Sequence, residues 1–216
     1  PGHITWRWKD DSLGKRHWFY GKVLRKKATM IDLAVTPYFY ALSNNYGNPE
    51  EDVFIQYNEG SLTLEAKLIF ETILDNGPMD TIAIRRATRM TSKESNSRFD
   101  RAMALLQADF KITPIGISDS GGWRYAFIYD LVHRYYPEIL VKARSIRDDE
   151  ARDTLVTLYF QSDGAAQMPD IIRLFQWSRA DMEKTLIHLV ETGIISNGIH
   201  HPTIDGEWFA LQSLIQ

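Results

Sequence analysis

The chain has 216 residues, of which 44% are hydrophobic and 25% are charged, a composition typical of a soluble globular protein with one large domain or two to three small ones. It contains no cysteine, which excludes disulfides, thiolate metal ligands and a cysteine nucleophile and favours a cytoplasmic protein. A membrane-spanning helix needs about 18 consecutive apolar residues, and no such run is present.

The beginning of the chain, PGHITWRWKDD, lacks the apolar stretch of a signal peptide and has no initial Met. We therefore expect no signal peptide, and we expect the chain to be processed, trimmed or a fragment.

The net charge of −3 is unevenly distributed, with +1 in residues 1–60, +2 in residues 61–145 and −6 in residues 146–216. Neutralised phosphates supply much of the affinity of proteins for DNA. A nucleic-acid surface is therefore expected in the first two thirds of the chain, and a protein contact in the last third.

The first predicted region, residues 1–60, is rich in aromatic residues, namely Trp6, Trp8, Trp18, Tyr38, Phe39 and Tyr40. Residues 15–27 and 35–43 have helical patterns, and residues 44–52 predict a loop. The pattern leaves open whether this region is a third, partial winged helix or an arm that packs on the rest.

Within it, the stretch WFYGKVLRKK mixes aromatic and basic residues. Apolar Phe19, Val23 and Leu24 predict one buried side, and aromatic residues usually belong to the core. Base stacking by Trp18 or Tyr20 is the alternative. The cations expected to contact phosphate are Lys22, Lys26 and Lys27.

Residues 61–127 have the pattern of a winged helix-turn-helix. A first helix ends at Asn76-Gly77-Pro78, a short second helix follows, and Thr91 to Glu94 predict a capping box for a third. The run KITPIGISDSGGWRYAFIYD then predicts a hairpin, or wing. The wing carries Lys111 and Arg124 beside Asp119, so little contact with a minor groove is expected from it.

The third helix places Phe99, Met103, Leu106 and Phe110 on one apolar stripe, which leaves its other side in water. That side would probe base edges, and two arginines of the preceding helix would approach phosphates. A solvated face, with Glu94 and Asp100 cancelling part of the charge, is the alternative. The candidate DNA-binding residues here are Arg85, Arg86, Lys93, Ser97, Arg98 and Arg101.

Residues 128–147 predict a connecting helix interrupted near Pro137, and residues 148–216 repeat the winged-helix plan. The repeat has a helix cap at Ser178, a helix-ending Gly193 and a hairpin turn at Asn197-Gly198. The predicted fold is mainly α with small β-wings (α+β), as tandem winged helix-turn-helix domains behind the aromatic-rich region.

The third helix of the second repeat exposes a mixture of charges in a region of net charge −6, which favours a protein partner or a homo-oligomer over DNA. The residues expected on its surface are Arg179, Ala180, Asp181, Lys184, His188 and Glu191.

Several short motifs of the first forty residues occur together. These are Trp6-x-Trp8, Tyr20-Gly21-Lys22, Lys26-Lys27 and Pro37-Tyr38-Phe39. With the winged helix that follows, they resemble bacterial AlkZ-related proteins over about residues 5–125. These are short relatives of the AlkZ-like winged-helix DNA glycosylases, which remove alkylated or crosslinked bases.

The resemblance implies tandem winged helices around a concave DNA-binding face, and in the glycosylases a catalytic Gln-x-Gln or Gln-x-Asp element. This chain departs from that element: the nearest string is Gln56-Tyr57-Asn58, in which only Gln56 could orient a water. A polar loop before a helix is the alternative interpretation of this string.

Other chemistry is not indicated. The six histidines are scattered, His200-His201 has no partner at metal-ligand spacing, and neither a phosphate loop nor a G-x-S-x-G motif is present. We expect no metal and no cofactor. The predicted function is DNA binding without catalysis; the alternatives are an AlkZ-like glycosylase acting on alkylated bases and a protein-docking or dimerisation scaffold.

Overall fold

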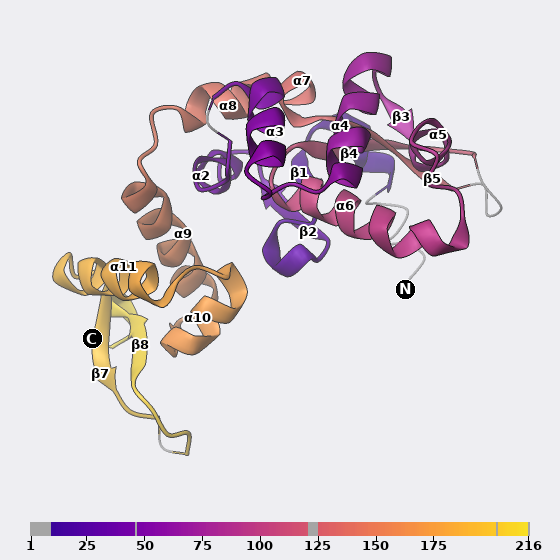
Figure 1. Ribbon diagram of the computed structural model, residues 1–216. Helices are drawn as coiled ribbons and strands as arrows, with labels where there is room; N and C mark the ends of the chain where they lie inside the picture. Colours follow the sequence, from indigo (N-terminus) through magenta and orange to yellow (C-terminus); the bar gives the residue numbers. More distant parts are fainter. Residues whose placement is uncertain (1–9, 46, 121–124, 202, 216) are drawn as a thin grey trace. The chain divides into compact units, whose positions relative to one another are not determined.

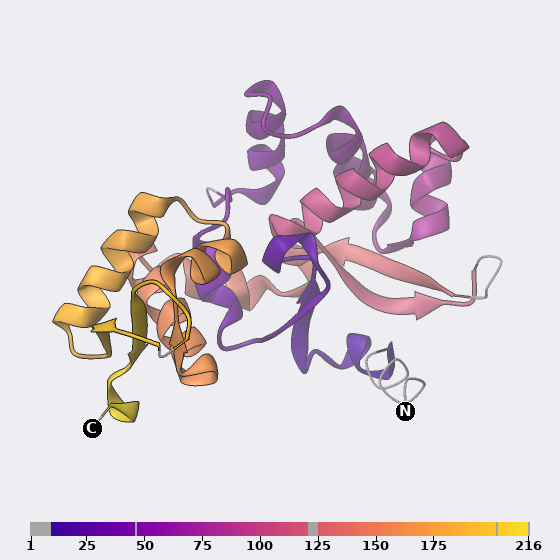
Figure 2. The same ribbon diagram turned by 90° about the horizontal axis from the view of Figure 1, so that it is seen from below.

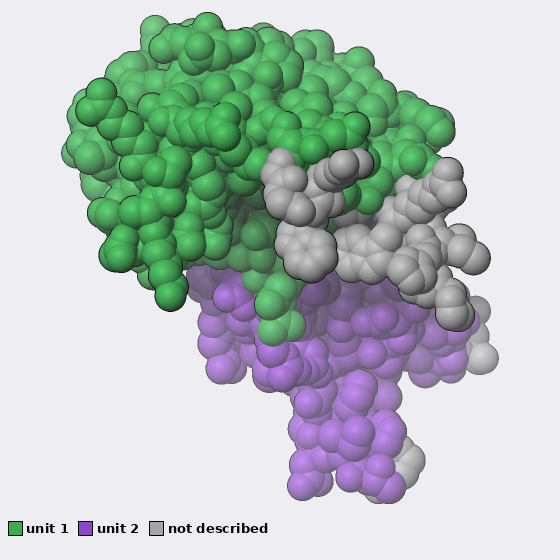
Figure 3. Space-filling model, turned by 90° about the vertical axis from the view of Figure 1, so that its right-hand side faces the viewer, with its two compact units in different colours: residues 1–144 green, residues 145–216 purple. Residues whose placement is uncertain are grey.

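The computed structural model describes residues 10–45, 47–120, 125–201 and 203–215. The chain divides into two compact units, residues 1–144 (unit 1) and 145–216 (unit 2) (Figure 1; Figure 3). Trp6, Trp8 and Arg124 lie outside the described residues.

Unit 1 begins with an antiparallel hairpin rather than the helix predicted over residues 15–27. Strand β1 (Trp18–Gly21) pairs with β2 (Thr29–Asp32). Burial alternates along β1, with Phe19 fully buried between half-buried Trp18 and Tyr20, and this period of two is that of a strand. The prediction failed because a few apolar residues fit both periods. Two single 3-10 turns flank β1, η1 (Leu13–Lys15) and η2 (Leu24–Lys26).

Two helices follow. Helix α2 (Thr36–Ala41) lies within the predicted helical stretch, whereas α3 (Pro49–Asn58) begins inside the predicted loop of residues 44–52. Pro49 at the first helical position and the three carboxylates that follow it favour a helix start. Gln56 therefore lies on a helix and not in a turn.

The next part of unit 1 has the order helix, short strand, helix, helix, strand, strand. The elements are α4 (Leu64–Asn76), β3 (Met79–Asp80), α5 (Thr81–Ala87), η3 (Lys93–Ser95), α6 (Asn96–Ala108), β4 (Ile112–Ser118) and β5 (Ala126–Leu131). The antiparallel sheet has the order β3-β5-β4, and Figure 2 shows the long β4–β5 hairpin. The cap before the third helix is Ser92, one residue later than predicted, and its hydroxyl accepts from the Ser95 amide.

Residues 128–131 belong to β5, so the predicted connecting helix starts later and is split at Pro137 into α7 (Val132–Tyr135) and α8 (Pro137–Ala143). Unit 1 has two cores. One joins α4, α5 and α6, and includes Phe99, Met103 and Leu106 as predicted. The other joins the N-terminal hairpin and α2 to Phe110, α7 and α8. Phe110 does not extend the α6 stripe as predicted, because the helix ends at Ala108 and the backbone at Phe110 is left-handed, with φ of 53°. The N-terminal region therefore packs on the helices of unit 1.

Unit 2 repeats the order of elements seen from α4 to β5. Its elements are α9 (Asp148–Asp163), β6 (Ala165–Ala166), α10 (Met168–Phe175), α11 (Arg179–Glu191), β7 (Ile195–Ile199), β8 (Trp208–Leu211) and η4 (Gln212–Leu214), with the sheet order β6-β8-β7. The predicted cap at Ser178 is confirmed, because its hydroxyl accepts from the Asp181 amide at 3.1 Å. The chain is thus an α+β protein with small antiparallel sheets.

One predicted turn of unit 2 is wrong. Asn197 and Gly198 lie within β7, where the pairing with β8 shifts between Ser196 and Ile199. The left-handed Gly198 serves a bulge, which needs the same backbone conformation as a hairpin turn. The actual connection between β7 and β8 lies after Ile199. No helix in the described part of the chain combines the length and apolarity of a membrane span.

Candidate nucleic-acid interface

Helix α6 and the η3 turn before it present the polar side that the sequence predicted. Lys93, Ser97, Arg98 and Arg101 are all exposed. The opposite side is held by buried Phe99 and the rest of the apolar stripe, so the helix cannot rotate without exposing its core residues. The cationic side is therefore fixed toward water.

A basic groove of about 340 Å³ brings three of the predicted residues together. Lys26 from the η2 turn faces Arg98 and Arg101 from α6. The rest of the lining comes from α6 and from the start of α4. From α6 these are Ala102, Ala104 and Leu105, and from the start of α4 they are Thr63 and Glu65. Residues more than seventy positions apart in the sequence thus form one cationic surface, which we call the basic groove.

One carboxylate borders this groove. Arg98 donates to Glu65 at 3.3 Å, which neutralises part of its charge. Neither Lys26 nor Arg101 forms an ion pair with any carboxylate that the structure describes. Within the described residues, the groove therefore retains two uncompensated cations.

The backbone at Arg25 and Lys26 is left-handed, with φ of 54° and 55°. Residues other than glycine adopt this conformation at a cost of about 1–2 kcal/mol each. Strained backbone of this kind is concentrated at functional sites, where the surrounding structure maintains it. The turn that carries Lys26 into the groove is thus unfavourable locally.

The other predicted cations differ in exposure. Lys27 and Arg86 are exposed and Lys22 is half-buried, and none of the three joins an ion pair among the described residues. Glu94 is exposed in η3 beside Lys93, and hydrogen bonds from its own backbone amide and from Ser92 lower the pKa of its carboxyl. Glu94 is therefore negative at neutral pH and remains a repulsive neighbour for phosphate.

Arg85 has a different place from the one expected. Its guanidinium donates to the Met90 carbonyl at 3.2 Å and to Asn96 Oδ1 and Asp100 Oδ1, both at 2.9 Å. It also lies 3.8 Å from the centre of the Phe99 ring. These contacts join α5 to the start of α6 and neutralise Asp100, so Arg85 positions the helix instead of standing free for a phosphate.

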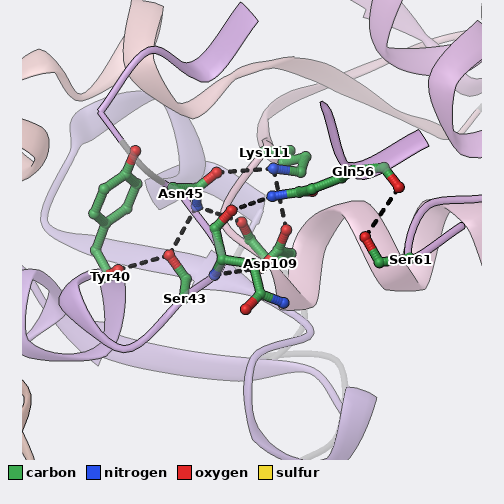
Figure 4. Close-up of polar contacts among 8 residues, drawn as sticks. Tyr40, Ser43, Asn45, Gln56, Ser61, Asp109 and Lys111 are labelled. Atoms are coloured by element: carbon green, nitrogen blue, oxygen red, sulfur yellow. Dashed lines mark hydrogen bonds and ion pairs between the residues drawn. The ribbon is translucent and has the colours of Figure 1, made fainter. Parts of the chain in front are cut away.

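Gln56, the candidate for orienting a water, is 3% exposed. Its side-chain amide donates to the Asn44 carbonyl, and its backbone carbonyl accepts from the Ser61 hydroxyl at 3.0 Å (Figure 4). The same carbonyl accepts from the amides of Ser61 and Leu62. The side chain of Gln56 therefore holds the loop before α3, and its backbone carbonyl holds the turn after α3.

Beside Gln56 lies a buried polar network that sequence reasoning missed. The Lys111 side chain is 1% exposed, and its ammonium donates to Asn45 Oδ1 at 2.8 Å and lies 3.1 Å from Asp109 Oδ2 (Figure 4). Asn45 in turn donates to the Asp109 carbonyl at 2.8 Å. Lys111 is thus an internal ion of unit 1 and does not belong to a DNA-facing wing.

No group of three metal-binding side chains occurs among the described residues. His201, one of the paired histidines, uses Nδ1 to accept from the Thr203 amide at 3.2 Å.

These features define the class of the protein: an α+β chain whose N-terminal unit carries a fixed cationic helix side and a basic groove. The model of the family described as "AlkZ related" matches residues 1–176, and the chain belongs to that family. The match extends past the expected residues 5–125 and includes α10 of unit 2. Membership indicates a protein related to DNA repair. No curated protein and no solved structure matches the chain.

Proposed function

We propose that this protein binds DNA through unit 1 without acting as a catalyst, and that the basic groove and the cationic side of α6 form the contact surface. The observation that supports this most directly is the convergence of Lys26, Arg98 and Arg101 in one groove. In this arrangement Lys26 and Arg101 neutralise phosphates, while Lys93 and Ser97 reach toward base edges. Lys22, Lys27 and Arg86 extend the same basic surface.

The order of elements supports a winged helix-turn-helix from α4 to β5, and a second one from α9 to β8. In such a module the third helix enters the major groove and its N-terminal half contacts base edges. Lys93, Ser97 and Arg98 lie in the corresponding part of η3 and α6. We therefore propose α6 as the recognition helix.

The described residues give no specific support to glycosylase activity. Gln56 is buried and its amide is used by the Asn44 carbonyl, and Asn58 stands where the family element has Gln or Asp. Binding without base removal is the function that the geometry favours.

The test compares two double charge reversals. Lys93→Glu/Arg101→Glu changes the cationic side of η3 and α6 and is called the α6 variant. Arg179→Glu/Lys184→Glu makes the same change in net charge on α11, the third helix of unit 2. Affinity for a fluorescent duplex is measured by anisotropy at several salt concentrations. We expect the α6 variant to lose binding by about tenfold or more and to reduce the slope of log K against log salt by about one for each lost phosphate contact.

The α11 variant should bind nearly as well as the unchanged protein. Equal losses in both variants would mean that only the net charge matters, and would contradict a surface on α6. An alkylated duplex tests catalysis in the same experiment. Abasic sites formed by the unchanged protein would support the glycosylase alternative, and their loss in a Gln56→Ala variant with unchanged thermal unfolding would assign the activity to Gln56.

A further inference from the structure

Helix α11 presents an unusual outer side for a third helix of this arrangement. Its buried positions are Met182, Thr185, Leu186 and Leu189. On the opposite side, Glu183, Ile187 and Glu191 follow one another at intervals of four residues, so they share one face. Ile187 is 59% exposed, although it is a large apolar residue.

A groove of about 570 Å³ runs beside this ridge, bounded by α11, the start of α10 and the connection between β7 and β8. Its floor is apolar and its rim is acidic, and we call it the acidic groove. The floor residues are Met168, Leu186, Val190 and Phe209, exposed Ile187 borders them, and the rim carboxylates are Glu183, Glu191, Asp205 and Glu207.

Among the residues that the structure describes, the negative charge of the rim is almost uncompensated. Arg179 lines the same groove, but it donates to Glu183 at 2.7 Å and leaves the other carboxylates of the rim unpaired within the described residues. The far wall is held in place because Gln167 donates to the Asp205 carbonyl at 2.7 Å. The groove is therefore a fixed, negatively charged depression with an apolar floor.

These properties exclude a phosphate backbone, which the carboxylates would repel, and they complement an amphipathic segment with positive charges. From Glu183 to Glu191 the helix rises by about 12 Å, which is about two turns. That length matches the spacing of anchors at positions i, i+3, i+4 and i+7 of a helix bound in a groove.

We propose that the acidic groove of unit 2 docks a lysine- and arginine-rich amphipathic helix of a partner protein. The apolar side of that helix covers Ile187 and Val190. Its cations lie against Glu191, Asp205 and Glu207. DNA contact by unit 1 and protein contact by unit 2 would then each involve the third helix of the repeated order of elements.

The experiment uses the full chain and a labelled peptide of about 14 residues, or about four helical turns, with Leu at the anchor positions and Lys elsewhere. Binding is measured by fluorescence anisotropy. One control peptide has the same composition in scrambled order, and another has Glu in place of Lys. We expect only the amphipathic Lys peptide to bind.

Two variants locate the contact. Ile187→Ser removes the apolar anchor, and Glu191→Lys reverses one rim charge; each should weaken binding by about tenfold or more, or about 1.4 kcal/mol. Asp163→Lys is the matched control, because Asp163 also ends a helix of unit 2 but does not line the groove. It should change the affinity less than about twofold. Thermal unfolding of each variant checks that it folds.

Equal binding of the scrambled peptide, or unchanged affinity in Ile187→Ser, would overturn the proposal. So would a dimer of the free chain that dissociates in Ile187→Ser, because the groove would then hold a second copy.

Discussion

Lys26 combines a positive charge with a backbone conformation that usually favours glycine. Its side chain lines the basic groove. The backbone conformation would be more stable with glycine at this position, whereas the proposed DNA contact needs the lysine side chain. Such an opposition is common where a binding surface is maintained at the expense of stability.

We expect Lys26→Gly to raise the free energy of unfolding by about 1 kcal/mol, because glycine adopts the left-handed conformation without strain. The same change should weaken DNA binding, because one phosphate contact is lost. Urea denaturation and anisotropy titration measure the two effects. Gln176→Gly is the control, since Gln176 has φ of 61° but lies in unit 2. It should stabilise the protein and leave DNA affinity unchanged. An unaltered affinity in Lys26→Gly would contradict the role of Lys26.

For Gln56 and Lys111, residue type alone predicts the wrong environment. Both are polar residues that the sequence assigned to a loop or a wing, and both are almost completely buried. Both side chains contact the segment of residues 44–45, which lies 12 positions from Gln56 and 66 positions from Lys111. No local pattern contains that information.

At the scale of elements, the short helix α5 depends on one cap. The Asp80 carboxylate accepts from the amides of Ala83 and Ile82 at 2.8 and 2.9 Å, and Ser118 of β4 donates to its other oxygen at 3.2 Å. The hydrogen bond from the Ala83 amide is the largest cause of the lowered pKa of Asp80, and those from Ser120, Ser118 and Ile82 contribute. The cap thus connects the start of α5 to the hairpin.

We expect Asp80→Ala to lower the free energy of unfolding by about 0.5–2 kcal/mol. Because the pKa of Asp80 is lower in the folded state, its charge stabilises the fold fully above the ordinary pKa of 3.8, and this contribution is lost as the pH falls through the lower folded value. Asp80→Asn should keep most of the cap but show less loss of stability in acid. Urea denaturation at several pH values measures both effects. An equal acid dependence in the Asn variant would exclude Asp80 as the cause.

The elements that the sequence predicted well are those with one dominant signal. Phe99, Met103 and Leu106 are a helical stripe, and the Ser178 cap has its Asp181 partner three residues later. The sequence of the N-terminal hairpin predicts a helix because four-residue strands contain too few positions to separate a period of two from one of 3.6.

At the scale of the molecule, the two units have separate hydrophobic cores. Phe70 is buried in the core of α4, α5 and α6 in unit 1, and Phe160 is buried in the core of unit 2. Separate cores allow separate unfolding transitions.

We expect Phe70→Ala and Phe160→Ala each to destabilise its own unit by about 3–5 kcal/mol. Calorimetry should show a lowered transition for the altered unit and an unchanged one for the other. At temperatures below both transitions, the DNA affinity of Phe160→Ala should be unchanged. The DNA affinity of Phe70→Ala should fall only in proportion to the fraction of unit 1 that is unfolded. A single transition that moves equally in both variants would contradict independent units.

The sequence by itself determined the α+β class, the repeated order of helices and strands, the family resemblance and the acidic character of the last third. These depend on composition and on local spacing, which a chain carries before it folds. Only the tertiary structure decided that Lys26 meets Arg98 and Arg101, that Arg85 and Lys111 are used internally, and that Ile187 lies beside a groove with an acidic rim. The packing of distant elements decides which of these residues become neighbours. Each helix and strand buries one face, and this burial determines which side chains remain outside and which of them meet.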